Sequence, residues 1–382
     1  MTTWPIRYAL DLVMIRVLRN EDGGKVRSSP ERRRVMGMRK TVLLLISVTV
    51  ALLLAGAVTL FAPKERAEAA FPGTSANIAF LTDRDGNHEI YTMSFSDGKW
   101  GNPKRLTDNR KSDKTPAFSP NGKKIVWERG DYLYLMNADG SKEHRIPNTF
   151  HTNYEIGRYG SYGGNPAFSR NLPRGNKIIF DKNKNIFTIN PDGTGLNRIT
   201  NSAPGGTCNV KPTFVHPVWS PVSNKIAFSY LCGKADRELH VMPLSDLSNK
   251  RNLDNTSRLS PAGIDVYRPD WSPDGTQIVY ECSDYPCESG TTHSRNPNIY
   301  KVDLNSINIP IVTSSADDSY PVFSPGRGKI VFSSDRTTGR GVNNPTGDEE
   351  LFVKNADGSG DPQQITFNRK RDVEPDWQPI VR

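Results

Sequence analysis

The sequence predicts an all-β fold, a six-bladed β-propeller, in which six four-stranded antiparallel sheets are arranged in a ring around an axis. Three observations predict it. A short motif recurs six times at a nearly constant spacing, each repeat has room for four short strands, and the two ends of the chain supply complementary parts of one repeat. Radial repetition of this kind leaves few sheet edges unprotected.

The recurring motif is a proline, then a small, apolar or acidic residue, an aromatic residue and, in most copies, Ser-Pro. Its copies begin at Pro116, Pro166, Pro217, Pro269, Pro321 and Pro375, separated by 50, 51, 52, 52 and 54 residues. Periods of this length are typical of propellers and solenoids. Parallel β-helices have much shorter repeats, and residues 70–382 lack convincing helical periodicity, so the repeat indicates β-blades.

Each repeat contains four β-type segments. The motif forms the first segment, and a tight turn, clearest at 272–275 (Ser-Pro-Asp-Gly), leads to the second, for example 278–280 (Ile-Val-Tyr). Proline and glycine suit such a turn because proline presets φ and glycine tolerates the geometry that follows. The third segment alternates apolar and polar residues, as in 298–302, and the fourth ends in Arg-Leu-Thr (105–107) or a related triplet. The pattern predicts four-stranded blades.

The two ends of the repeat region complete each other. Residues 78–107 supply strands two to four with no first strand before them, whereas 375–381 supply a first strand with nothing after it. We therefore expect the strand of Trp377 to pair beside the strand that begins near Ile78, which would close the ring within a single domain, 70–382.

Composition and charge narrow the functional classes. Hydrophobic residues make up 35% of the chain and charged residues 24%, which is typical of a folded protein. The net charge is +9, but residues 1–69 hold 12 Lys/Arg against 6 Asp/Glu, so the predicted propeller is close to neutral. No nucleic-acid partner is therefore expected.

The amino-terminal part predicts export. Residues 42–61 contain no charge, basic residues precede them, and Ala67-Glu68-Ala69 follows. Residues 36–69 are therefore either a signal peptide cleaved after Ala69 or an uncleaved membrane anchor. Both alternatives place the remainder outside the cytoplasm, because the basic flank stays inside. Residues 1–35 form a leader upstream of Met36 and Met38, either of which can be the translation start.

The repeats resemble those of the TolB-like, WD-repeat-like β-propeller family, in which Ser-Pro-Asp-Gly precedes an apolar strand. The resemblance extends to 82–91, which begins Thr-Asp-Arg-Asp-Gly, and more weakly to 334–336 with 350–352, and it covers roughly 78–379. It implies the propeller fold, and it suggests a role in the cell envelope, where TolB works through a lipoprotein partner. TolB also has an amino-terminal α/β domain, which we expect to be missing here because few residues separate the apolar run from the first strand.

Four cysteines lie in the exported part. In an oxidising compartment an even number predicts disulfides, and the absence of a Cys-x-x-Cys pair speaks against zinc. Spacing alone leaves three connectivities open. On the propeller arrangement all four lie in loops of one face, which pairs Cys208 with Cys232 and Cys282 with Cys287.

Five polar residues precede the repeat prolines and are candidate ligand-binding residues. They are Asp113, Asp318 and Asp372, each three residues before its proline, Asp265 one place earlier, and His216 beside Pro217. We expect them to ring one mouth of the central channel, where convergent carboxylates would suit a polar ligand or a cation such as Ca²⁺ or Mn²⁺. The alternative is that each aspartate caps its own turn by accepting backbone N–H groups.

The loop 150–165 is longer and more aromatic than its counterparts. Its Tyr154, Arg158, Tyr159 and Tyr162 combine contact area with polar tips, as interface residues do. This loop and 336–348 are the candidates for partner contact, the alternative being a surface insertion without a partner.

These observations favour a non-catalytic binding scaffold in the cell envelope. The expected partner is an envelope or extracellular protein, or a small polar or carbohydrate ligand; the chain is expected to be a monomer, without an obligatory cofactor. The alternative is a metal-dependent, lactonase- or lyase-like enzyme that uses the channel carboxylates. The sequence contains no Gly-x-Ser-x-Gly, His-Glu-x-x-His or glycine-rich phosphate loop that would indicate another enzyme class.

Overall fold

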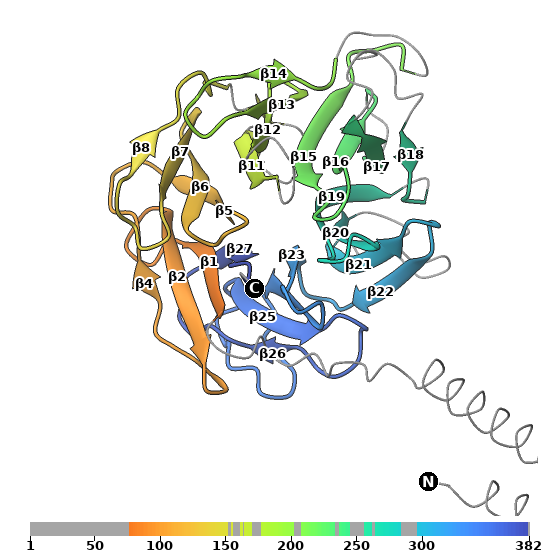
Figure 1. The fold of residues 1–382 in the computed structure, drawn as a ribbon. Coiled ribbons are helices and arrows are strands. Elements are labelled where there is room, and N and C mark those ends of the chain that lie inside the picture. Colours follow the sequence, from red (N-terminus) through yellow and green to blue (C-terminus); the bar gives the residue numbers. More distant parts are fainter. Residues whose placement is uncertain are drawn as a thin grey trace, which may run out of the picture. The chain divides into compact units, whose positions relative to one another are not determined.

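The computed structural model confirms the predicted propeller. It describes residues 76–151, 164–169, 177–201, 208–233, 237–244, 256–261, 264–283 and 296–380, and the backbone of 154–155 and 161–162. Within these ranges no α-helix forms, and six antiparallel sheets are arranged in a ring (Figure 1). Cavities lined by the innermost strands form a central channel. No helix of the described ranges is long and apolar enough to cross a membrane. The leader segments 1–35 and 36–69 lie outside these ranges.

Five blades are each built from four consecutive strands, and the innermost strand of each contains the repeat proline. In chain order they are β5 (Asp113–Phe118), β6 (Lys124–Arg129), β7 (Tyr132–Asn137) and β8 (His144–Arg145); β11 (Gly164–Phe168), β12 (Ile178–Lys182), β13 (Asn185–Ile189) and β14 (Asn197–Arg198); β15 (Thr213–Trp219), β16 (Lys225–Leu231), β17 (Glu238–Pro243) and β18 (Ser257–Arg258); β19 (Asp265–Trp271), β20 (Gln277–Ser283), β21 (Asn298–Asp303) and β22 (Asn308–Val312); and β23 (Asp318–Phe323), β24 (Lys329–Ser334), β25 (Glu350–Asn355) and β26 (Gln363–Gln364). We number these blades one to five.

The sixth blade joins the two ends of the described chain, as the sequence predicts. The innermost strand β27 (Asp372–Trp377) pairs with β1 (Ala76–Thr82), which pairs with β2 (Glu89–Ser96); β3 (Lys99–Trp100) and β4 (Lys104–Arg105) complete the sheet. In this register Trp377 lies opposite Ile78. Figure 1 shows the blue β27 beside the orange β1. The ring is therefore closed by hydrogen bonds between residues almost 300 positions apart.

The Ser-Pro turn explains the strongest part of the motif. In the fourth blade the Ser272 hydroxyl accepts the N–H of Gln277 at 2.9 Å, and the Ser272 carbonyl accepts the N–H of Gly275 at 2.8 Å. Gly275 has φ of +66°, which glycine adopts without a Cβ penalty. The serine thus holds the turn from strand one to strand two closed, and Ser119 and Ser324 make the equivalent bonds in the first and fifth blades.

The hydrophobic core lies between neighbouring blades and not at one centre. Trp377 and Ile78 of the sixth blade share a buried cluster with Val331 and Leu351 of the fifth. Each blade depends on the next for burial, because a single sheet cannot cover its own apolar face.

The structure confirms the disulfide between Cys208 and Cys232, with Cα atoms 5.7 Å apart. Cys282 is also disulfide-bonded, and its predicted partner Cys287 lies outside the described residues. The confirmed bond joins the segment that leads into β15 to the segment that follows β16.

Replacement of the closing tryptophan should open the ring. Trp377 is 1% exposed, and its ring centroid lies 5.7 Å from that of Trp100. Trp377→Ala is expected to lower the free energy of unfolding by about 3–5 kcal/mol, the usual cost of emptying a buried tryptophan site. Urea denaturation followed by tryptophan fluorescence and circular dichroism measures it.

Ile380→Ala is the matched control, because Ile380 is 44% exposed just beyond the same strand. It should change the free energy of unfolding by no more than about 0.5 kcal/mol. A loss for Trp377→Ala as small as that of the control would contradict the predicted role of the sixth blade.

Candidate functional site

Three of the predicted channel aspartates form buried ion pairs. The Arg129 guanidinium donates to both carboxylate oxygens of Asp113 at 2.6 and 2.8 Å, and Arg84 donates to both oxygens of Asp372 at 2.9 and 3.0 Å. Arg336 donates to Asp318 at 2.5 Å. The pair of Arg129 and Asp113 is bidentate, which fixes its geometry. In blades one, five and six the aspartate therefore holds the start of the innermost strand to its own blade.

Asp265 has a related position but a different partner. Its carboxylate accepts the backbone N–H of Arg237 at 2.6 Å, and the Arg237 guanidinium lies 3.7 Å away. The structure thus does not gather the five predicted residues into one cluster: among them only His216 lines the channel cavities.

The residues that do meet in the channel are those immediately before the repeat prolines. We call them the pre-proline ring: Thr115, Asn165, His216, Arg268, Tyr320 and Glu374. All six have positive φ, between +32° and +56°, although none is glycine. Each lies at a break in the register between the first and second strands of its blade. Such a bulge re-aims side chains, and here it turns one polar residue per blade into the channel.

Carboxylates link the ring residues of neighbouring blades at two places. The Glu374 carboxylate accepts the backbone N–H of Thr115 at 2.6 Å, and Glu281 accepts that of Tyr320 at 3.3 Å. Arg268 donates to Glu281 at 2.8 Å and to the Tyr320 hydroxyl at 3.1 Å, with its guanidinium 3.9 Å from the Tyr320 ring centre. A bulge leaves backbone N–H groups without a ladder partner, and these carboxylates supply one.

On another side the ring adjoins a buried titratable cluster. The Asn165 amide donates to Asp181 at 2.9 Å, and His151 Nε2 lies 3.8 Å from a Glu128 oxygen. Burial raises the pKa of Asp181 to about 7 and also raises the pKa of Glu128. For His151, burial acts against the charged form, but the hydrogen bond and charge of Glu128 raise the pKa overall.

Gly164, next to the ring, makes room for this cluster. A Cβ atom at this position would lie 2.5 Å from Glu128 Oε2, and Gly164 has φ of +93°. Both the space and the backbone conformation therefore require glycine.

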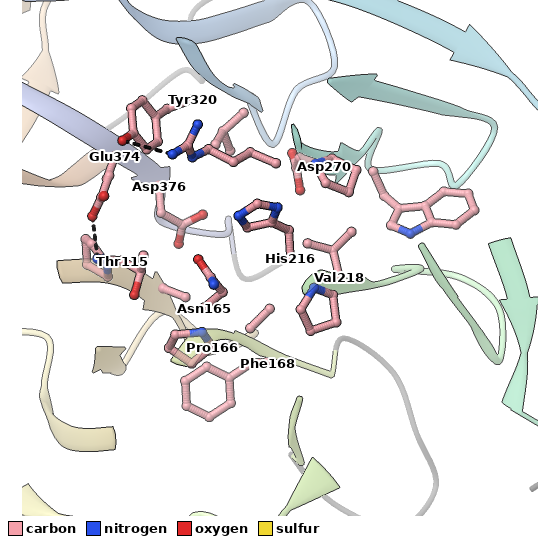
Figure 2. Close-up of a pocket in the computed structure, with 18 of the residues that line it drawn as sticks. Thr115, Asn165, Pro166, Phe168, His216, Val218, Asp270, Tyr320, Glu374 and Asp376 are labelled. Atoms are coloured by element: carbon pink, nitrogen blue, oxygen red, sulfur yellow. Dashed lines mark hydrogen bonds between the residues drawn. The ribbon is translucent and has the colours of Figure 1, made fainter. Parts of the chain in front are cut away.

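The ring separates two cavities. The loop-face cavity, of about 580 Å³, opens among the segments that lead into the innermost strands and those that join strands two and three, such as 335–349. The turn-face cavity, of about 160 Å³, lies on the side of the Ser-Pro turns and is lined by the repeat prolines and the residues after them (Figure 2). All six ring residues line both cavities.

His216 is the most buried member of the ring. Burial, together with the positive charges of Arg268 and Arg237, lowers the pKa of His216 well below its ordinary value. Its imidazole is therefore neutral at physiological pH and adds no positive charge to either cavity. In Figure 2 the side chains of His216, Asn165 and Asp376 are directed toward the middle of the turn-face cavity.

A metal site finds no support in this arrangement. Among the described residues no three histidine, cysteine, aspartate or glutamate side chains lie close enough together to hold a metal ion. The aspartates expected to attract a cation are those already paired with arginine. A Ca²⁺ or Mn²⁺ ion at the channel mouth, which the sequence offers beside a polar ligand, therefore stays an untested alternative.

The predicted partner-contact residues are placed in part. Tyr154 and Tyr162 belong to a separate two-stranded hairpin, β9 (Tyr154–Glu155) with β10 (Ser161–Tyr162), whereas Arg158 and Tyr159 lie outside the described residues. The second candidate, 336–348, reaches the loop-face cavity at Gly347 and Asp348.

Comparisons with known proteins agree with the fold. No family model matches the chain. A TolB homolog from Chlorobium luteolum is 27% identical over 153 residues, which make up 40% of this chain and 31% of that protein. The crystal structure of TolB from Acinetobacter baumannii matches with a TM-score of 0.56 at 20% identity, covering 80% of this chain and 67% of that one. A putative TolB from Agrobacterium tumefaciens matches with a TM-score of 0.50 at 16% identity, covering 76% and 88%. The predicted TolB-like propeller is confirmed at the level of the repeat and the fold.

The buried cluster beside Asn165 should make stability depend on pH. Because burial raises the pKa of Asp181 to about 7, the folded chain keeps a proton that the unfolded chain releases at a lower pH. The stabilisation that protonated Asp181 contributes to the fold is fully present below the pKa of Asp181 in the unfolded chain, about 4. It is lost as the pH rises through about 7. Asp181→Asn keeps an acceptor for Asn165 and removes this dependence. Between about pH 5 and pH 8, the free energy of unfolding of the variant should rise relative to that of the parent chain by roughly 2–4 kcal/mol. Urea denaturation at each pH measures it.

Asp139→Asn serves as control, because Asp139 is exposed and a neighbouring serine lowers its pKa. Its denaturation curve should track that of the parent chain across this range. Parallel stability curves for Asp181→Asn and the parent would show that Asp181 is ionised throughout.

Proposed function

We propose that this chain is an exported, TolB-like propeller that acts as a non-catalytic binding scaffold in the cell envelope, and that its loop-face cavity receives a basic segment of a partner protein. The observation that carries the proposal is the acidic lining of this cavity. Of its lining residues, seven are carboxylic acids and three are Lys or Arg (acidic: Glu128, Glu281, Asp317, Asp335, Asp348, Glu349 and Glu374; basic: Lys114, Arg268 and Arg371). A concave surface of one charge sign attracts a partner of the opposite sign.

The acidic excess is concentrated on one arc of the cavity. Arg268 is paired with Glu281, and Arg371 with Glu349, so these cations are balanced by their own neighbours. Asp317, Asp335 and Asp348, all half-buried, lie in the segments that lead into β23 and join β24 to β25. A cationic side chain of a partner would therefore be attracted most strongly to this arc of the fifth blade.

The segment 336–348 is held in place for such a contact. The buried Asn344 amide donates to the carbonyls of Arg336 and Asp348, and the backbone N–H of Asn343 donates to the Gln364 side chain at 2.7 Å. A loop fixed before binding loses less conformational entropy when a partner docks. The cavity also exceeds 500 Å³, a size that takes several side chains.

Two observations support an extracytoplasmic location. The disulfide Cys208–Cys232 is a bond that persists in oxidising compartments, and it stiffens the loop face. The apolar run 42–61 with its basic flank has the features of an export signal. The metal-dependent enzyme is the alternative, and it has no ligand cluster among the described residues to support it.

Removing charge from the arc should weaken binding of a basic peptide. The full chain is titrated into a fluorescein-labelled peptide of alternating lysine and glycine, and affinity is measured by anisotropy. Asp335→Asn with Asp348→Asn should weaken binding by about fivefold to thirtyfold and reduce its salt dependence, because two carboxylates no longer contribute. Asp335→Asn keeps an oxygen that can accept the N–H of Asp317, and Asp348→Asn keeps one that can accept the Thr346 hydroxyl.

The control removes two charges on the opposite face. Asp139→Asn with Asp357→Asn replaces exposed carboxylates in the β7–β8 and β25–β26 turns, and it should leave the affinity unchanged. Equal affinities of the parent chain and the double variant, or no salt dependence, would contradict a basic partner at this cavity.

Export can be tested separately. A reporter enzyme that folds only outside the cytoplasm, fused after residue 380, should be active in a bacterial host, and removal of 36–69 should abolish the activity. Reporter activity that survives this deletion would contradict the assignment of the signal.

A further inference from the structure

The turn-face cavity differs from the loop-face cavity in chemistry. Beyond the ring, its wall is formed by the six repeat prolines and the residue after each of them. That residue is Ala117, Ala167 and Val218 in blades one to three, Asp270 in blade four, Val322 in blade five and Asp376 in blade six, and all six are half-buried. One arc of the wall is therefore apolar, and the opposite arc carries two carboxylates.

The two carboxylates are held on the wall by the neighbouring blades. Asp270 accepts the backbone N–H of Phe323 at 2.9 Å, and Asp376 accepts that of Phe118 at 2.6 Å. Each bond joins one blade to the next and fixes the carboxylate beside the cavity. A carboxylate fixed in this way needs no rearrangement to meet a cation.

The charge balance of this cavity is negative. Its lining contains one cation, Arg268, against three carboxylates, Asp270, Glu374 and Asp376, a balance of −2. Arg268 donates to Glu281 and to the Tyr320 hydroxyl. The carboxylate of Glu281, which does not line this cavity, therefore balances the charge of Arg268. The imidazole of His216 is neutral for the reasons given above. A cationic group entering the cavity therefore meets little repulsion.

Volume and lining restrict the size of the ligand. The cavity measures about 160 Å³, and a dry apolar cavity of about 150 Å³ holds a benzene molecule. Prolines, alanines and the aromatic Phe168 and Trp219 offer a surface for an apolar ring, while the carboxylates can accept hydrogen bonds from an ammonium group.

We propose that the turn-face cavity is a binding site for a small aromatic ammonium compound, a single ring on a short chain that ends in a protonated amine. The ring lies against the apolar arc of blades one to three, and the ammonium group lies between the carboxylates of Asp270 and Asp376. This site is separate from the loop-face cavity and does not depend on the proposed function.

The test compares three ligands of one shape on the purified full chain by isothermal titration calorimetry. The probes are 2-phenylethylammonium, the neutral 2-phenylethanol and the anionic phenylacetate. The ammonium compound should bind at least about tenfold more tightly than the alcohol, and phenylacetate should show no binding up to about 10 mM. Equal binding of the ammonium compound and the alcohol, or no binding of the ammonium compound up to that concentration, would overturn the proposal.

Variants then locate the site. Asp270→Asn with Asp376→Asn keeps an oxygen for each backbone N–H bond and removes both charges, and it should weaken binding of the ammonium compound by at least about tenfold. Asp139→Asn with Asp357→Asn, the matched control in the β7–β8 and β25–β26 turns on the same face, should bind as the parent chain does. Because both carboxylates also hold contacts between blades, Val218→Phe is the second variant. It fills the apolar arc, leaves both carboxylates in place and should abolish binding. Parent-like binding by Val218→Phe, or by a folded double variant, would show that the ligand binds elsewhere.

Discussion

The bulge before each repeat proline is the constraint on which the rest of the structure depends. Proline has no N–H, so it interrupts the ladder between the first and second strands, and the residue before it takes a positive φ at a cost on the order of 1 kcal/mol. This strain recurs six times. Hydrogen bonds to charged acceptors are worth about 1.5–3 kcal/mol, enough to offset it. In blades one and five the acceptor comes from the preceding blade: Glu374 binds the N–H of Thr115, and Glu281 binds that of Tyr320. In these two blades the contacts that relieve the bulge therefore also hold adjacent blades together.

This backbone device determines where a site can be. Because the bulge is the same in every blade, six side chains reach the channel at one level, whatever their identity. Their chemistry can therefore vary without loss of the fold, and here it does: a hydroxyl, an amide, an imidazole, a guanidinium, a phenol and a carboxylate meet in one ring. The ring in turn divides the channel, so that one propeller presents two cavities of different charge distribution to its two faces.

The sequence was sufficient for the fold and insufficient for the site. The motif of proline, aromatic residue and Ser-Pro predicted six blades. The strand of Trp377, which has no second strand after it, predicted the closure. Both predictions depend on local turn chemistry and on the number of strands that each part of the chain supplies. Asp113, Asp318 and Asp372 stood out by their spacing, but their arginine partners come from β6 and from the segments that follow β24 and β1, at distances along the chain that no periodicity reveals. The pre-proline ring was missed apart from His216, because its members share a backbone conformation and not a residue type. A signal was present: every residue before a repeat proline is polar.

Different interactions hold the two sides of the ring in place. Arg268, Glu281 and Tyr320 form an ion pair and a stacked contact. Asn165 instead rests on Asp181, for which burial raises the pKa to about 7, beside Glu128 and His151. When Asp181 is ionised it can only accept a hydrogen bond from Asn165; when it is protonated it can also donate one, which permits the amide to turn its oxygen toward the carboxyl group. An ion pair and a ring contact thus hold the Arg268 side, whereas the polarity that Asn165 shows to the channel follows the protonation of Asp181, which lines neither cavity.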